Sequence, residues 1–152
     1  MSGKVTALLV FHQTKPFDEI KAALGQMAVP TEQAQTLAEA KHALSDANPP
    51  LLAFTESELP DGKWSDIVSF SQNAASRVNV IVVGQRIDAN LYASAIEVGA
   101  FDYIAPPFEG GDLAHVVRCA ADNALARRET AKNSRPTAEQ LLSVAVTSQA
   151  NA

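Results

Sequence analysis

The chain has 152 residues, of which 47% are hydrophobic and 19% are charged, and this composition suits one globular domain with a single core. Its formal net charge of -5 argues against electrostatic capture of nucleic acid or of an anionic membrane, because both need clustered Lys and Arg. The sequence shows neither a basic leader followed by an apolar run nor the roughly 20 apolar residues of a spanning helix, so we expect a soluble, cytoplasmic protein with a protein partner.

Four short segments are almost continuously apolar, which is typical of strands that are covered on both faces of a parallel sheet. These segments are residues 5–11, 51–55, 78–83 and 103–105. A further strand is expected at residues 30–35, where the polar sequence and the leading Pro30 suit only the edge of a sheet.

Five longer segments alternate with these strands and repeat their apolar residues at three- and four-residue spacings, which predicts helices. They are residues 17–27, 36–47, 64–74, 90–98 and 112–128. The alternation predicts an α/β, flavodoxin-like (βα)5 fold, a three-layer sandwich around a five-stranded parallel sheet of order 2-1-3-4-5. Gly99 is expected to end the fourth helix in a left-handed conformation. The single cysteine, Cys119, excludes an intrachain disulfide, and its apolar surroundings predict a small core residue in the last helix.

The composition changes after Arg128. Residues 129–136 are polar and end at a proline, so a linker is predicted there. The chain is therefore divided into a domain at residues 4–128 and a linker with a C-terminal tail or short helix at residues 129–152. A capping box of Thr137 and Gln140 precedes the apolar residues of this tail.

Three motifs resemble those of the receiver domains of bacterial two-component signalling, the CheY-like family. They are the turn Leu59-Pro60-Asp61-Gly62, the run Ala-Ile-Glu-Val-Gly-Ala-Phe-Asp-Tyr-Ile at residues 95–104, and Pro107-Phe108. The resemblance covers about residues 4 to 128. It implies an acidic pair after the first strand, a phosphate-accepting aspartate after the third, a hydroxyl after the fourth and a lysine after the fifth.

Every one of these functional positions departs from the family pattern. The acidic pair falls on Phe11 and His12, the phosphoacceptor on Glu56, the hydroxyl on Gly84 and the lysine on Pro106. An aromatic ring and a neutral imidazole cannot form the oxygen cage that Mg²⁺ prefers, and glycine and proline supply neither hydroxyl nor cation. The resemblance therefore implies a degenerate pseudo-receiver without catalytic residues, without Mg²⁺ and without another cofactor.

Glu56 has several interpretations. Its permanent charge could mimic a phosphorylated aspartate, or it could be a solvated carboxylate at the end of a strand. A hydrogen bond from the His12 side chain would make the site sensitive to pH. Together with Glu58, His12 and Glu56 could also hold zinc, although a set of three ligands lacks the fourth and no metal site is predicted.

The resemblance places an aromatic switch at Tyr103, whose ring could point inward or outward, and implies a cis bond between Pro106 and Pro107. The alternative for Tyr103 is a half-buried ring whose hydroxyl binds water. Trp64 is expected to be a packing residue. The family's usual partner and dimer surface, made by the fourth and fifth helices and the fifth strand, would present these residues: Tyr92, Tyr103, Arg118, Arg127 and Arg128. Aromatic rings and arginines suit a protein interface, but the arginines also suit a solvated helix end.

Three functions remain open at this point. The first is an atypical, phosphorylation-independent receiver domain, not an enzyme, that binds a protein partner or dimerises and makes no direct contact with nucleic acid or membrane. The second is a receiver that still accepts phosphate within a phosphorelay. The third is an unrelated flavodoxin-like ligand binder, for which no glycine-rich phosphate loop follows the first strand.

Overall fold

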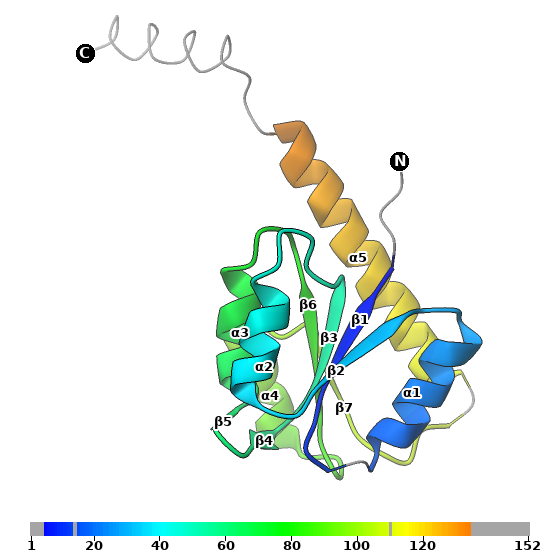
Figure 1. The fold of residues 1–152 in the computed structure, drawn as a ribbon. Coiled ribbons are helices and arrows are strands. Elements are labelled where there is room, and N and C mark those ends of the chain that lie inside the picture. Colours follow the sequence, from blue (N-terminus) through cyan, green and yellow to red (C-terminus); the bar gives the residue numbers. More distant parts are fainter. Residues whose placement is uncertain (1–4, 14, 110, 135–152) are drawn as a thin grey trace, which may run out of the picture.

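The computed structural model describes residues 5–13, 15–109 and 111–134. Its centre is a five-stranded parallel sheet of order β2-β1-β3-β6-β7, which confirms the predicted topology with β2 at one edge (Figure 1). The strands are β1 (Ala7–Val10), β2 (Thr31–Ala34), β3 (Leu52–Glu56), β6 (Asn79–Val83) and β7 (Asp102–Ile104).

Helices cover both faces of this sheet, as a three-layer sandwich requires. On one face lie α1 (Phe17–Gln26) and α5 (Asp112–Ser134). On the other lie α2 (Leu37–Leu44), α3 (Trp64–Gln72) and α4 (Ala89–Val98) (Figure 1).

Each layer of helices encloses its own hydrophobic core, because successive side chains of a strand point to opposite faces of the sheet. In β1, Leu8 packs with the α2, α3 and α4 layer, whereas Leu9 packs with α1 and α5. Both side chains are fully buried. Trp64 belongs to the first of these cores and is the packing residue that its sequence context predicted.

A two-stranded hairpin, β4 (Glu58–Leu59) and β5 (Gly62–Lys63), contains the turn that the sequence indicated. The carboxylate of Asp61 in this turn accepts hydrogen bonds from the backbone N–H groups of Leu37 at 2.6 Å and Ala38 at 3.2 Å. These are free donors at the start of α2, and the Leu37 bond is the main cause that lowers the pKa of Asp61. The motif therefore fixes the beginning of α2.

Helix α5 is longer than the sequence indicated and continues past Arg128 to Ser134, so the predicted linker is wrong for residues 129–134. Polar residues do not end a helix by themselves, and Pro136 is the next strong breaker. The guanidinium of Arg128 anchors the helix by donating to the carbonyls of Arg77 at 2.7 Å, Pro49 at 3.1 Å and Pro50 at 3.0 Å. The predicted capping box at Thr137 lies outside the described residues.

The prediction for Cys119 is also wrong, because this thiol is exposed and lies 3.6 Å from His115 Nε2. The face of α5 that packs on the sheet is formed by Val117, Ala120, Ala121 and Ala124, and Cys119 lies outside that stripe. Gly99 does have the expected positive φ, at 123°, just after α4. Within the described ranges, no helix is both long and apolar enough to cross a membrane.

Candidate functional site

The residues that correspond to the receiver chemistry lie together at the carboxyl ends of the strands. Glu56 is the last residue of β3, and its Oε1 atom accepts hydrogen bonds from the backbone N–H groups of His12 and Gln13, the latter at 3.1 Å. The His12 residue itself is exposed. His12 and Glu56 are therefore in contact, but the hydrogen bond comes from the peptide nitrogen of His12, and the described contacts include none from its imidazole.

The other half of the acidic pair is used for packing. The ring of Phe11 stacks on Phe17 of α1, with ring centroids 4.6 Å apart and an interplanar angle of 16°. Phe17 is buried in the α1 and α5 core, and Phe11 packs against the same core. An aromatic side chain in this place attaches the loop after β1 to α1 and supplies no ligand for a cation.

Gly84 and Tyr103 are in direct contact. The Tyr103 ring points inward, is buried, and its hydroxyl donates a 2.6 Å hydrogen bond to the carbonyl of Arg86. The hydroxyl therefore has a protein acceptor, and the alternative of a half-buried ring with a water-bound hydroxyl is wrong. A Cβ atom added to Gly84 would collide with this hydroxyl and would lie 2.7 Å from Cζ of the ring. Burial is the main cause that raises the pKa of Tyr103.

Two glutamines complete the network, and sequence reasoning missed both. The side-chain amide of Gln85, directly after Gly84, donates a 3.1 Å hydrogen bond to the amide oxygen Oε1 of Gln13. The loops after β1, β3 and β6 are thus joined by uncharged donors around one carboxylate. Each glutamine stands next to a position that the resemblance had marked, and this adjacency was the only signal in the sequence.

The remaining positions offer little chemistry. Pro106 is half-buried, and the Pro106–Pro107 peptide bond is cis, as the resemblance implied. Glu58 is exposed on the β4–β5 hairpin. Among the described residues, no three His, Cys, Asp or Glu side chains gather in a way that could hold a metal ion.

Several large hydrophobic residues on α4 and just before it are exposed to solvent. Tyr92 is 49% exposed, and its ring meets that of Tyr103 edge to face, with centroids 6.4 Å apart and an interplanar angle of 87°. The other large exposed hydrophobic residues of the described chain lie nearby in the sequence and were missed: Ile87, Ile96 and Val98. We name these four residues the α4 patch. A signal was present, because α4 contains only one charged residue, Glu97.

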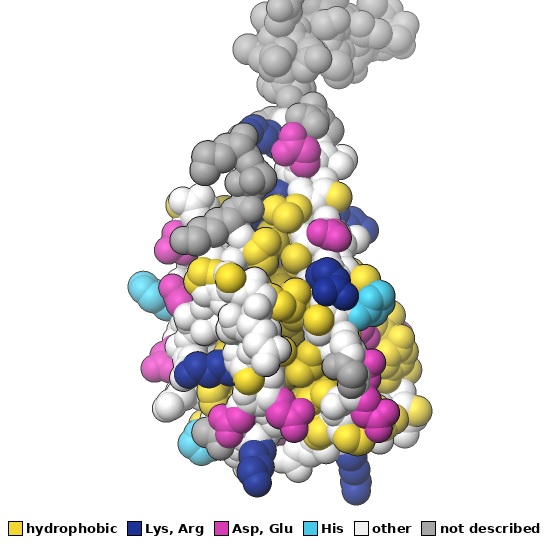
Figure 2. All heavy atoms as spheres, turned by 90° about the vertical axis from the view of Figure 1, so that its right-hand side faces the viewer, with side chains coloured by type: hydrophobic (Ala, Val, Ile, Leu, Met, Phe, Trp, Pro, Cys, Tyr) yellow, Lys and Arg dark blue, Asp and Glu magenta, His cyan; other side chains and the backbone are white. Residues whose placement is uncertain are grey.

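The three arginines expected on this surface lie elsewhere. Arg118 lines an apolar hollow between α5 and the turn after α1, together with Met27 and Val29. Figure 2 shows this side of the molecule, where a band of hydrophobic side chains runs between charged residues. Arg127 lines a hollow near Gly99, and Arg128 is the anchor of α5. Of the predicted interface residues, the structure therefore brings only Tyr92 and Tyr103 together.

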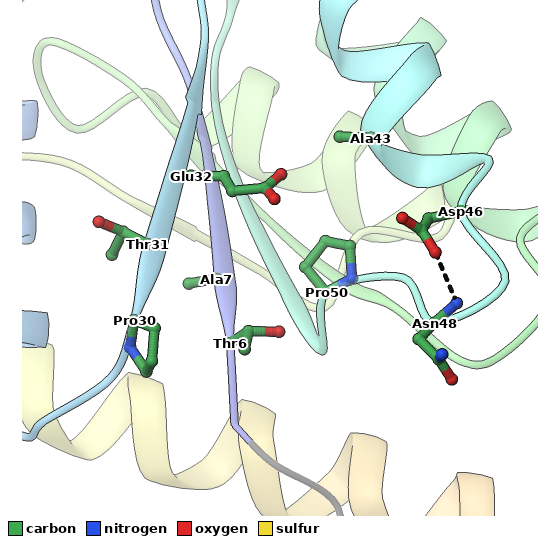
Figure 3. A pocket seen from close by; sticks show the side chains of 9 residues that line it. All are labelled: Thr6, Ala7, Pro30, Thr31, Glu32, Ala43, Asp46, Asn48 and Pro50. Atoms are coloured by element: carbon green, nitrogen blue, oxygen red, sulfur yellow. Dashed lines mark hydrogen bonds between the residues drawn. The ribbon is translucent and has the colours of Figure 1, made fainter.

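A separate hollow of about 210 Å³ lies at the opposite, amino-terminal edge of the sheet. Thr6 and Ala7 from the start of β1, Pro30 and Thr31 from the start of β2, and the bend held by the Asp46–Asn48 hydrogen bond line it (Figure 3). None of the predicted site residues takes part in it.

Comparisons with known proteins show what this sequence and fold resemble. No protein-family model matches the chain. The response regulator protein PilR of Pseudomonas aeruginosa is 28% identical over 114 residues, which are 75% of this chain and 25% of that protein. The photosynthetic apparatus regulatory protein RegA of Cereibacter sphaeroides is 26% identical over 116 residues, which are 76% of this chain and 62% of that protein. The matched region thus spans less than two thirds of these relatives.

Among solved structures, a response regulator receiver domain protein (CheY-like) from Methanospirillum hungatei JF-1 superposes with a TM-score of 0.68 at 20% identity. The match covers 80% of this chain and 97% of that structure. The chain therefore has the fold of response regulator receiver domains, and its sequence is similar to two response regulators.

Proposed function

We propose that this receiver domain acts without phosphorylation, as a module for protein interaction or dimerisation. The observation that carries the proposal is the state of Glu56, whose carboxylate is already held by the N–H groups of His12 and Gln13. Phosphoryl transfer to a carboxylate needs a neighbouring cation that neutralises the incoming charge. Here two backbone N–H groups, rather than a cation, stabilise the negative charge of the Glu56 carboxylate.

The residues around Glu56 do not fit Mg²⁺. This ion requires near-ideal octahedral oxygen ligands, usually from carboxylates and water. Phe11 supplies a stacked ring and His12 a peptide nitrogen, so Glu56 is the one carboxylate that the expected positions provide. The domain is therefore proposed to be a binding module that needs no metal, rather than an enzyme.

The position of Tyr103 supports an output that needs no phosphate. Because Gly84 has no side chain, the space beside it accommodates the Tyr103 hydroxyl, which is then held by Arg86. Tyr92, one of the residues of the α4 patch, packs edge to face against the inward ring. We propose that this surface is the interface and that it is presented continuously.

The chemistry of the α4 patch favours a protein partner over other kinds. Exposed aromatic and aliphatic side chains on a helix with a single charge suit burial against another apolar surface. Nucleic acid and anionic membranes would instead require clustered cations.

Phosphorylation is tested directly. The protein is incubated with acetyl phosphate and Mg²⁺, and intact mass spectrometry is used to look for a phosphoryl adduct. A receiver with an intact acidic pair, aspartate and lysine serves as the positive control in the same reaction. We expect an adduct on the control alone; a stoichiometric adduct on this chain would instead support a phosphorelay component.

The interface is tested by sedimentation velocity over a range of concentrations. For dimerisation, we expect concentration-dependent association that Ile96→Glu abolishes and that Ser69→Glu, at an exposed site on α3, leaves intact. A monomer at every concentration would exclude self-association and leave a different protein as the partner. Association that persists in Ile96→Glu would contradict the proposed surface.

A further inference from the structure

A hollow of about 450 Å³ lies at the amino-terminal edge of the sheet, away from Glu56. It is bounded by the end of α3, the connection to β6, Gly99 after α4, and the outer part of α5. Its described lining residues include two arginines, Arg77 and Arg127, and no aspartate or glutamate. A positively charged hollow is unusual in a chain whose formal net charge is -5.

Arg77 is held firmly in place. Its Nε atom donates a 3.1 Å hydrogen bond to Oδ1 of Asn79, which is buried and in turn donates to the carbonyl of Ala120 at 2.9 Å. Its backbone carbonyl accepts the 2.7 Å hydrogen bond from Arg128. The backbone and the inner part of the side chain are thus fixed, while the terminal nitrogens of the Arg77 fork make no hydrogen bond within the described residues.

No described acidic group balances the positive charge of this hollow. Burial, and then the charge of Arg127, lower the pKa of Arg77, and no acidic group contributes to that shift. The carbonyls at the end of α3, which could attract the arginines, already have donors: Ser69 and Phe70 accept from Asn73, and Ser71 accepts from Ala74. Two like charges therefore lie close together without a counterion among the described groups.

We infer that this hollow binds a small phosphate-bearing anion. A phosphate dianion matches the two guanidinium charges, whereas one carboxylate would leave one of them uncompensated. Its several oxygens can accept from the planar forks of both arginines, and the half-buried Ser76 beside Arg77 adds a hydroxyl donor. The site lies at the edge of the sheet opposite Glu56. Reversible binding of an anion there would give the domain a regulatory signal that does not depend on phosphoryl transfer.

Inorganic phosphate is the first probe. It is titrated into the labelled protein at constant ionic strength, and the amide resonances of Ser76, Arg77 and Gly99 are followed by NMR. We expect saturable shifts there and none at His12 or Gln13. Shifts that never saturate, or that spread over the whole surface, would overturn the site because they indicate screening alone.

Variants and a second anion class make the test specific. Arg127→Gln should weaken phosphate binding at least tenfold, and Arg118→Gln, on the α1 side of the same helix, should change it less than twofold. Thermal unfolding of both variants verifies that they are folded. Unchanged affinity in Arg127→Gln would overturn the inference, and so would citrate binding more tightly than pyrophosphate, since that order would indicate a carboxylate site.

Discussion

The hydroxyl of Tyr103 occupies the space that a side chain at Gly84 would fill. In the family pattern this position carries a hydroxyl residue, whereas here its absence leaves room for an inward aromatic ring that donates to the Arg86 carbonyl. The departure at Gly84 and the aromatic residue at Tyr103, which look unrelated in the sequence, therefore form one packing unit in the structure.

Gly84→Ala should force Tyr103 to move. The added methyl group cannot share the space of the hydroxyl, so we expect a loss of about 1–3 kcal/mol in the free energy of unfolding. An outward ring is less buried, so the pKa of Tyr103, which burial raises, should fall toward its ordinary value. Ultraviolet absorbance titration in a Tyr92→Phe background reads Tyr103 alone, because the chain has two tyrosines. Gly25→Ala, where the new methyl group meets nothing within 4 Å, is the control. Equal changes in the free energy of unfolding for both substitutions would contradict the proposed packing of Tyr103 beside Gly84.

Glu56→Ala should release the loop after β1. The N–H groups of His12 and Gln13 lose their acceptor, at a cost of about 1 kcal/mol for bonds that water can partly replace. Amide hydrogen exchange at these two residues should accelerate. Glu56→Gln retains a side-chain oxygen and should preserve most of the protection. Unaltered exchange in the alanine variant would show that the loop is held by other contacts.

Asp61→Asn should weaken the start of α2 in a manner that depends on pH. Because hydrogen bonds from the backbone, chiefly from Leu37, lower the pKa of Asp61 in the folded protein, its stabilising contribution is present above the ordinary carboxyl pKa. That contribution is lost as the pH falls through the lowered value. The free energies of unfolding of wild type and variant, measured with denaturant, should therefore differ at neutral pH and become equal in acid. Asp122→Asn, at an exposed site on α5, is the control, and a difference independent of pH would contradict the role of the charge.

Arg128→Gln should detach the outer part of α5. The guanidinium donates to three carbonyls from two connections, and hydrogen bonds to a charged group contribute about 1.5–3 kcal/mol. We expect lower unfolding stability and faster exchange at residues 129–132. Arg118→Gln should leave both unchanged, whereas unchanged exchange in Arg128→Gln would show that the helix persists without its anchor.

Most of the fold could be predicted because it depends on patterns that the sequence shows directly. Alternating apolar strands and amphipathic helices predicted the order of the sheet, and Pro30 placed β2 at its edge. The predictions were wrong where they relied on composition alone and ignored the position of a residue around the helix axis or the location of the next helix-breaking residue. Cys119 lies in an apolar segment but off the packed stripe of α5, and the polar residues after Arg128 continue the helix.

The candidate site was located by the sequence, but its contacts were not. The position of Glu56 followed from its place at the end of β3, whereas its partners are peptide N–H groups that every residue but proline carries. The loop that approaches the carboxylate is also attached to α1 by the stacking of Phe11 on Phe17, a tertiary contact. The link between Gln13 and Gln85 crosses two loops and has no local signature.

The Arg128 anchor has a further consequence for the sheet. Its acceptors at Pro50 and Arg77 lie just before β3 and β6, while the Glu56 and Gln85 contacts lie at or just beyond the other ends of the same two strands. These two strands are therefore tied at both ends by hydrogen bonds that involve a side chain. Sliding either strand by one residue would exchange its two buried faces and would also break bonds at both edges, so the register of the sheet is protected against slippage from both directions.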